Sequence, residues 1–68
     1  MKIDTVKLRI AMARSSMNIA DLAIVSGLSC NTIAAYTSGN RTPTTKNLGV
    51  ISHALGVDVT ELLKEQED

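Results

Sequence analysis

Apolar residues in this chain recur at intervals of three and four, the spacing that places side chains on one face of an α-helix. The spacing predicts a first helix over residues 5–16 with one stripe made of Leu8, Ala11, Met12 and Ser15. A second stripe, nearly opposite, is made of Val6, Ile10, Ala13 and Met17. A helix apolar on two sides is unusual at the surface of a small domain. We therefore expect part of the second stripe to cover the N-terminal segment or to meet a partner.

Residues 18–26 predict a second helix. Asn18 is a residue type that caps helix starts, because its side chain accepts a hydrogen bond from a free amide of the first turn. A packing face follows at helical spacing, made of Ile19, Leu22, Ala23 and Ser26. Gly27 ends the helix, where a left-handed backbone costs least, and Leu28 can fold back over that end.

A third helix follows the cap residue Ser29, and along it Ile33 and Tyr36 can face inward. Three polar or small residues can face outward: Asn31, Thr32 and Ala35. Two short helices joined by a glycine-centred turn form the layout of a helix-turn-helix, whose second helix fits the major groove of DNA. The pattern therefore favours DNA binding.

The remaining residues predict a loop and two more helices. Residues 37–44 are rich in turn-forming types and hold the single proline. Thr44 or Thr45 caps a fourth helix whose inward residues are Leu48, Ile51 and Leu55. Gly56 closes it, and a short last helix opens at Thr60 and Glu61 and carries Leu62 and Leu63. The whole chain is thus predicted to be all-α.

An ordered set of residues resembles the phage repressor and Cro helix-turn-helix family, that of XRE-type transcriptional regulators. The set lies within residues 5–63 and comprises Gly27, Leu28, Ser29, Ile33, Tyr36, Gly39, Pro43, Leu48, Ile51, Ala54, Leu55, Gly56, Val57, Leu62 and Leu63. The resemblance implies a compact five-helix bundle, a lambda-repressor-like DNA-binding domain with the helix-turn-helix at helices two and three. It also implies that the first stripe of helix one packs against the core.

Length and composition limit the alternatives. Sixty-eight residues make a single domain, 1–68, near the lower size limit for a chain without staples. A single cysteine cannot form an internal disulfide, and the sequence has no Cys/His cluster of the kind that binds zinc. We therefore expect a cytoplasmic, nucleoid-associated protein without a metal or cofactor. The apolar runs are too short to span a bilayer, and no signal-peptide pattern is present, so no membrane partner is expected.

The net charge is zero, but it is unevenly distributed. Residues 1–57 carry six lysines and arginines against two acids, whereas residues 58–68 carry one lysine against five acids. A basic body with an acidic tail at 64–68 is compatible with one face meeting phosphates while the tail points away. The ordinary alternative is a solvated acidic terminus that aids solubility.

The resemblance assigns DNA contacts position by position. The base-contacting candidates are Cys30, Asn31, Thr32 and Ala35. Asn31 is the strongest of them, because an amide can donate and accept together and so matches an adenine edge. The phosphate-contacting candidates are Asn18, Ser29, Ser38, Asn40, Arg41, Thr42 and Lys46. Since only Arg41 and Lys46 of this set are cationic, one copy should bind weakly, and we expect a homodimer on half-sites about one helical turn apart.

The chain departs from the family at several positions. Ile19 stands where the family commonly has a phosphate-bracing glutamine. Met12 and Thr37 stand where an arginine and an acid often pair, and an apolar contact can replace such a pair without loss. Ile24 and Val25 occupy positions that are usually polar, so they are chance surface residues or a partner site.

Other residues with chemical potential have plainer interpretations. Cys30 at a helix start would have a stabilised thiolate and could sense oxidation, but a lone cysteine of this kind is more often a small filler. His53 is expected to be a solvated surface residue. No serine has an identifiable histidine–carboxylate arrangement, so the chain is not expected to be an enzyme and no small-molecule ligand is evident.

Two functions remain from the sequence. The first is a sequence-specific transcriptional regulator, a repressor that binds an inverted-repeat operator as a homodimer through the recognition helix beginning at Ser29. The second is a small protein-interaction module, an antitoxin or anti-regulator with a protein partner. The low basicity, the second stripe of helix one and the aliphatic residues Ile19, Ile24 and Val25 favour it. For dimerisation, the last helix with Leu62 and Leu63 is preferred unless the core needs both residues.

Overall fold

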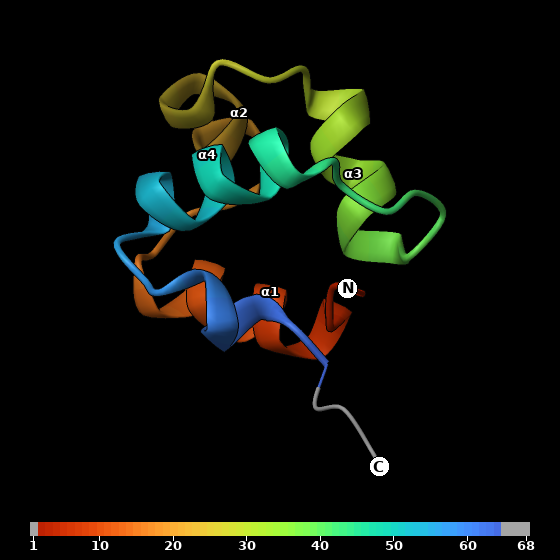
Figure 1. The fold of residues 1–68 in the computed structure, drawn as a ribbon. Coiled ribbons are helices and arrows are strands. Elements are labelled where there is room, and N and C mark those ends of the chain that lie inside the picture. The colour runs from red at the N-terminus through yellow and green to blue at the C-terminus, as the bar shows by residue number, and fades with distance from the viewer. Residues whose placement is uncertain (1, 65–68) are drawn as a thin grey trace, which may run out of the picture.

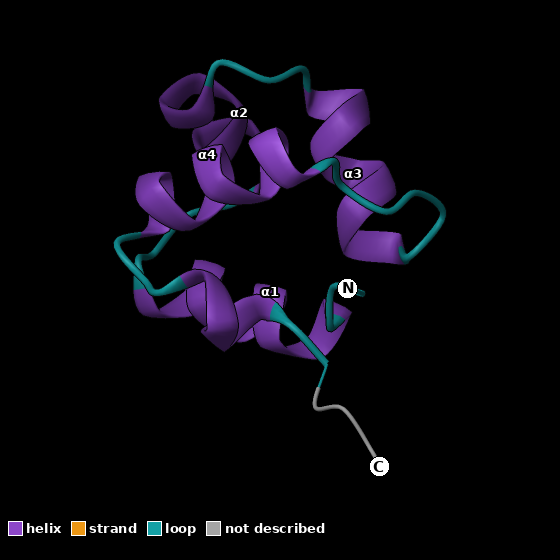
Figure 2. Cartoon of the chain, viewed as in Figure 1, coloured by secondary structure: helices purple, strands orange, loops and turns teal. Residues whose placement is uncertain are grey.

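The computed structural model describes residues 2–64, and its regular elements are all helical (Figures 1 and 2). They are α1 (Thr5–Arg14), α2 (Ile19–Ser26), α3 (Cys30–Ser38), α4 (Thr45–Leu55) and the 3-10 turn η1 (Val59–Leu62). Within this range no strand forms, and only an isolated antiparallel bridge joins Ile3 to Leu63. The all-α prediction is confirmed, but the predicted fifth helix is a 3-10 turn of four residues.

A single hydrophobic cluster holds these elements together. Its buried members are Ile3, Leu8, Ala11, Met12, Leu22, Ala23, Ile33, Tyr36, Leu48, Ile51, Leu55 and Leu62. Helix α2 contacts both α3 and α4, while α1 contacts α3 and η1. In Figure 1 the α1–η1 layer lies below α2 and α4, and α3 stands at one side of both layers. The core thus fixes α3 from two directions and leaves its outer side uncovered.

Most of the second stripe predicted for the first helix lies outside the core. Val6 is 61% exposed and Ile10 is 49% exposed, whereas Met17 packs partly against the cluster. The N-terminal segment is instead held by the chain's other end, since Ile3 pairs with Leu63. Leu62 is fully buried and Leu63 packs partly against the cluster, so the core uses both residues that the sequence prefers for dimerisation.

The ends of the helices follow from their capping residues. Thr44 is the cap of α4, because its side chain accepts the amide of Asn47. Helix α1 ends at Arg14 rather than at the predicted Ser16. Ser16 adopts a left-handed backbone with φ 56°, a conformation that terminates the helix and that sequence reasoning expects of glycine.

The connection between α2 and α3 is short and sharply bent. Gly27 closes α2 with φ 77°, and the axes of α2 and α3 are inclined by 120°. Leu22 of α2 and Ile33 of α3 are both fully buried, so the bend is held by packing on each side of it. The bend therefore gives α3 a fixed orientation relative to the rest of the bundle.

Candidate nucleic-acid interface

The start of α3 combines a neutral cap with exposed side chains. The Ser29 hydroxyl accepts the Thr32 amide at 3.1 Å and donates to the Thr32 hydroxyl at 2.8 Å. Cys30 and Asn31 are exposed, and no hydrogen bond of their side chains occurs within residues 2–64. The amides of a helix start carry partial positive charge, so this end can accept an anion.

The outer face of α3 is formed by residues of the predicted base-contacting set. Asn31 and Ala35 are four positions apart, so they share one face of the helix. Ala35 is half-buried, as is Thr32, whose hydroxyl is engaged by Ser29. The exposed functional groups on this face therefore belong mainly to Asn31 and Cys30.

The inner face of α3 is anchored by its buried residues. Ile33 and Tyr36 are almost fully buried, and the Tyr36 hydroxyl accepts a hydrogen bond from Asn47 Nδ2 at 3.0 Å. Asn47 lies in the first turn of α4, so this bond sets the position of α3 against α4. Sequence reasoning missed Asn47, because nothing in its local pattern distinguishes it from a solvated polar residue.

The carbonyl groups at the end of α3 are largely satisfied within the protein. The Ala35 carbonyl accepts the Arg41 amide, the Tyr36 carbonyl accepts the amide of the capping glycine, and the Thr37 carbonyl accepts Arg9 Nη2 at 3.2 Å. Arg9 thus ties α1 to the end of α3. The arginine and the acid that often pair in the family stand at the positions of Met12 and Thr37, which are both buried in this protein. Arg9 therefore occupies a different position from the arginine of that pair.

The predicted phosphate-contacting residues differ in how free their side chains are. Asn40, Arg41, Thr42 and Lys46 are exposed, in the α3–α4 loop and the first turn of α4. The Ser38 hydroxyl donates to the Ala35 carbonyl at 3.1 Å, so it would have to break this bond to donate to a phosphate. The loop residues therefore offer freer donors than Ser38 does.

Asn18 lies in a different electrostatic setting. Its side-chain oxygen accepts the Asp21 amide at 2.8 Å, while the Asp21 carboxylate accepts the Asn18 amide at 3.1 Å. This reciprocal capping box places a carboxylate at the start of α2. An anion is therefore already present where the sequence predicted a phosphate contact.

The cations of the described residues divide into two groups. Lys7 donates to the Leu63 carbonyl at 3.1 Å, Arg9 to the Thr37 carbonyl, and Arg14 pairs with Glu61 at 3.7 Å. The side chains of the other group have no hydrogen bond or ion pair within residues 2–64, and this group comprises Lys2, Arg41, Lys46 and Lys64. This second group is available for an external anion.

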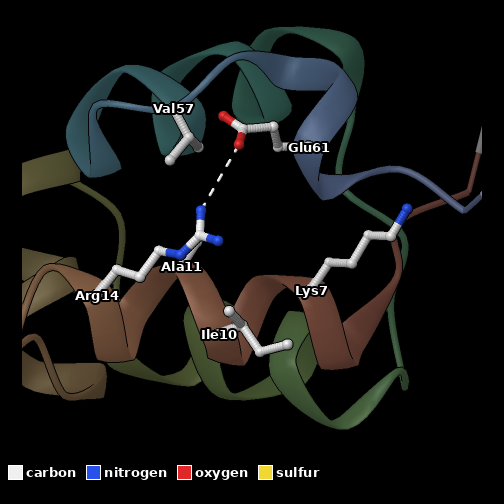
Figure 3. A pocket seen from close by; sticks show the side chains of 6 residues that line it. All are labelled: Lys7, Ile10, Ala11, Arg14, Val57 and Glu61. Atoms are coloured by element: carbon white, nitrogen blue, oxygen red, sulfur yellow. Dashed lines mark ion pairs between the residues drawn. The ribbon is translucent and has the colours of Figure 1, made fainter.

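Two surfaces with exposed aliphatic residues lie away from the outer face of α3. Ile24 is 81% exposed and Val25 is 54% exposed, and Val25 lines a hollow together with Val50 and His53 of α4. The other surface is a groove of about 280 Å³ between α1 and η1 (Figure 3), lined by Lys7, Ile10, Ala11, Arg14, Val57 and Glu61. The hollow is also lined by Lys46, and three of the six residues that line the groove are charged.

The described residues contain no group of three or more His, Cys, Asp or Glu side chains able to hold a metal ion. His53 is exposed. Among the same residues, no single helix is long and apolar enough to cross a membrane, and α2 with α3 passes that test only as a bent pair.

A family model described as a Cro/C1-type HTH DNA-binding domain matches residues 7–68. The match begins at the third residue of α1 and includes α2, α3, α4 and η1. No curated protein and no solved structure matches the chain.

Proposed function

Because the chain belongs to the Cro/C1-type HTH DNA-binding domain family, we propose that it is a sequence-specific transcriptional regulator that uses α3 as its recognition helix. Helices α2 and α3 then form the helix-turn-helix, and α3 enters the major groove of double-stranded DNA. The observation that carries this proposal is the outer face of α3, which has exposed polar groups and no covering element within residues 2–64.

Base recognition in this proposal depends on Asn31. Its amide group is exposed and free of intramolecular hydrogen bonds in the described chain, so it can pair with an adenine edge. A good bidentate contact of this kind contributes about 1–3 kcal/mol of discrimination. Cys30 and Ala35 supply apolar contacts beside it, and Thr32 supplies a hydroxyl hydrogen.

Phosphate contacts come from groups that the protein leaves free. The main contributors are Ser29 with the amides of α3, followed by the exposed residues Asn40, Arg41, Thr42 and Lys46. Asn18 and Ser38 contribute less, because one lies beside the Asp21 carboxylate and the other is bonded to Ala35. Such contacts set the register on DNA without reading its sequence.

A homodimer on an inverted-repeat operator follows from the small charge of this surface. Few cations face the DNA, so the electrostatic contribution of one copy is small and the salt dependence shallow. Two copies on half-sites one helical turn apart combine their contacts. We propose that the bound dimer represses transcription by blocking promoter access, and DNA as the partner implies a cytoplasmic, nucleoid-associated protein.

Selection of bound fragments from a random duplex pool tests this function, and an inverted repeat is the expected product. On the selected site, Asn31→Ala should abolish the preference at one base position, whereas Arg41→Gln should weaken all sequences similarly. If the two variants have the same effect, the division between base and phosphate contacts is wrong. If folded parent protein retains no duplex at low salt, the regulator assignment fails.

The exposed aliphatic pair Ile24–Val25 favours a second candidate function, a protein-interaction module such as an antitoxin or anti-regulator. Single exposed aliphatic residues are ordinary, but two adjacent ones beside a hollow can form a contact site. Co-purification of a stable one-to-one complex with an unrelated chain, lost in Ile24→Ser/Val25→Ser, would support this candidate. A parent protein that is purified without any partner chain would contradict it, whereas operator binding alone would not, because both roles can coexist.

A further inference from the structure

The two ends of the described chain meet the α3–α4 loop around a polar hollow of about 320 Å³. Three cations line it, Lys2, Arg41 and Lys64, each from a different segment. Three hydroxyl residues also line it: Thr5, Ser38 and Thr42. The hollow is thus rich in groups that bind anions, and it lies beyond the carboxyl end of α3, away from the base-contacting residues.

Backbone contacts bring together the segments that carry the three cations. The Lys64 amide donates to the Lys2 carbonyl at 2.9 Å, which holds the two lysines as neighbours. Gly39 closes α3 with φ 83°, and a Cβ built on it would lie 3.6 Å from the Thr5 methyl group. The loop that carries Arg41 is therefore held close to the start of α1.

No acceptor of the described protein uses these charges. Their side chains have no hydrogen bond or ion pair within residues 2–64, and the carbonyls of Ala35, Tyr36 and Thr37 near the hollow already have other donors. The nearby Asp4 carboxylate accepts the amides of Val6 and Lys7 at the start of α1. Three like charges around one hollow repel one another, and an anion bound between them would relieve that repulsion.

We propose that the Lys2–Arg41–Lys64 hollow binds a phosphate group, and that in the DNA complex this group belongs to the DNA backbone. The proposal rests on the proposed function and extends the contact surface beyond the α3–α4 loop to both ends of the described chain. Phosphate is the expected anion because a tetrahedral, multiply accepting group can be bonded by lysine, arginine and hydroxyl donors together.

Salt dependence of binding to the selected operator tests the proposal. Loss of one phosphate contact reduces the slope of log affinity against log salt by about 0.9. Accordingly, the affinity ratio of parent to Lys2→Gln/Lys64→Gln should shrink about 3.5-fold between 50 and 200 mM salt. Each single variant should give much of this effect, since both lysines serve one phosphate. Base preference should not change.

Arg14→Gln is the matched control, because it removes one charge at the opposite end of α1 from an ion pair with Glu61. If it changes the slope as much as Lys64→Gln does, net charge rather than the hollow explains the effect, and the proposal is wrong. If the parent binds no DNA, the proposed function itself fails. If the parent binds DNA and the lysine variants keep the same salt slope, only the proposal for the hollow is wrong.

Two further arms identify the anion. Inorganic phosphate, added without DNA, should leave the amide resonances of Lys2 and Lys64 in place at millimolar concentration. Shifts that saturate there, and vanish in the double variant, would assign the hollow to free phosphate instead. The lysine effect should also persist with Glu65→Gln, Glu67→Gln and Asp68→Asn combined. If the lysine substitutions change the salt slope only when these acids are neutralised, the chain's own acids occupy the hollow and the proposal is wrong.

Discussion

The helix starts of this protein fall into two groups that are capped by different chemistry. A carboxylate takes part at three starts: Asp4 caps α1, Asp21 completes the capping box that Asn18 begins at α2, and Asp58 with Glu61 forms the box of η1. Hydroxyls serve α3 and α4, through Ser29 and Thr44. All five starts have their capping hydrogen bonds, but only the hydroxyl-capped starts remain without a local anion. Most of the residues proposed to meet DNA lie next to these two starts, whereas Asn18 lies at the start of α2.

The difference predicts that a cap can influence binding as well as stability. An acid at a helix start interacts favourably with the helix dipole and uses up its attraction for other anions. A serine or threonine cap satisfies an amide and leaves that attraction available. Comparing α2 with α3 therefore separates the contribution of capping to folding from its contribution to DNA binding.

Removing the packing that orients both starts should have the largest effect. Leu22 is fully buried on α2, so Leu22→Ala is expected to lower the free energy of unfolding by about 2–5 kcal/mol. Urea denaturation measures this loss. Ile24→Ala, on the exposed side of the same helix, should change stability by no more than about 0.5 kcal/mol. Similar losses in both variants would mean that the described burial of α2 is wrong.

Removing the caps one at a time should separate the two starts. Ser29→Ala and Asn18→Ala each remove a side chain that accepts a helix amide, so each should cost about 1 kcal/mol of stability. Ser29→Ala should in addition weaken operator binding, whereas Asn18→Ala should weaken it less. Thermal unfolding and a filter-binding titration on the same samples test both statements. Equal affinity losses would contradict the distinction between the two starts.

Neutralising the acid at the start of α2 should have a smaller effect, of opposite sign on binding. Asp21→Asn removes an anion near the proposed phosphate positions and should raise DNA affinity by about two- to fivefold, the equivalent of 0.3–1 kcal/mol. Stability should fall by a comparable free energy. Asp58→Asn, at the start of η1, is the control and should leave affinity unchanged. An unchanged affinity in Asp21→Asn would show that the α2 start does not approach DNA.

The smallest expected effect is the pH dependence from Asp58. Hydrogen bonds from the Thr60 amide and hydroxyl lower the pKa of this carboxyl below its usual 3.8. Because the folded-state pKa is the lower one, its contribution to stability is present above about 3.8 and is lost as pH falls through the folded-state value. Asp58→Asn should therefore lose less stability than the parent in strongly acidic solution. If the parent and Asp58→Asn lose stability in parallel as the pH falls, Asp58 does not have this role.

The elements predicted best from the sequence were those with explicit capping residues. Asn18 and Gly27 bound α2, Ser29 starts α3, and Gly56 ends α4, each as expected. The end of α1 was misjudged because Ser16, not glycine, adopts the left-handed backbone there. The family was identified correctly from the ordered residue set, since its spacing reflects the packing of several helices.

Features that depend on distant parts of the chain could not be predicted. The Arg9–Thr37 hydrogen bond joins residues 28 positions apart, and Lys2 meets Lys64 only after both chain ends have packed. The capping box of Asn18 was readable in principle, because an acid three residues after a cap is its usual signature. The DNA contacts themselves stay predictions that the experiments above address.

Tyr36 has a consequence for how this protein can be observed. It is the only aromatic residue of the chain, and its ring is buried at the junction of α3 and α4 while its hydroxyl is bonded to Asn47. Intrinsic ultraviolet emission therefore arises from one chromophore, with no tryptophan to obscure it. A change in that signal reports directly on the seating of α3, without any attached label.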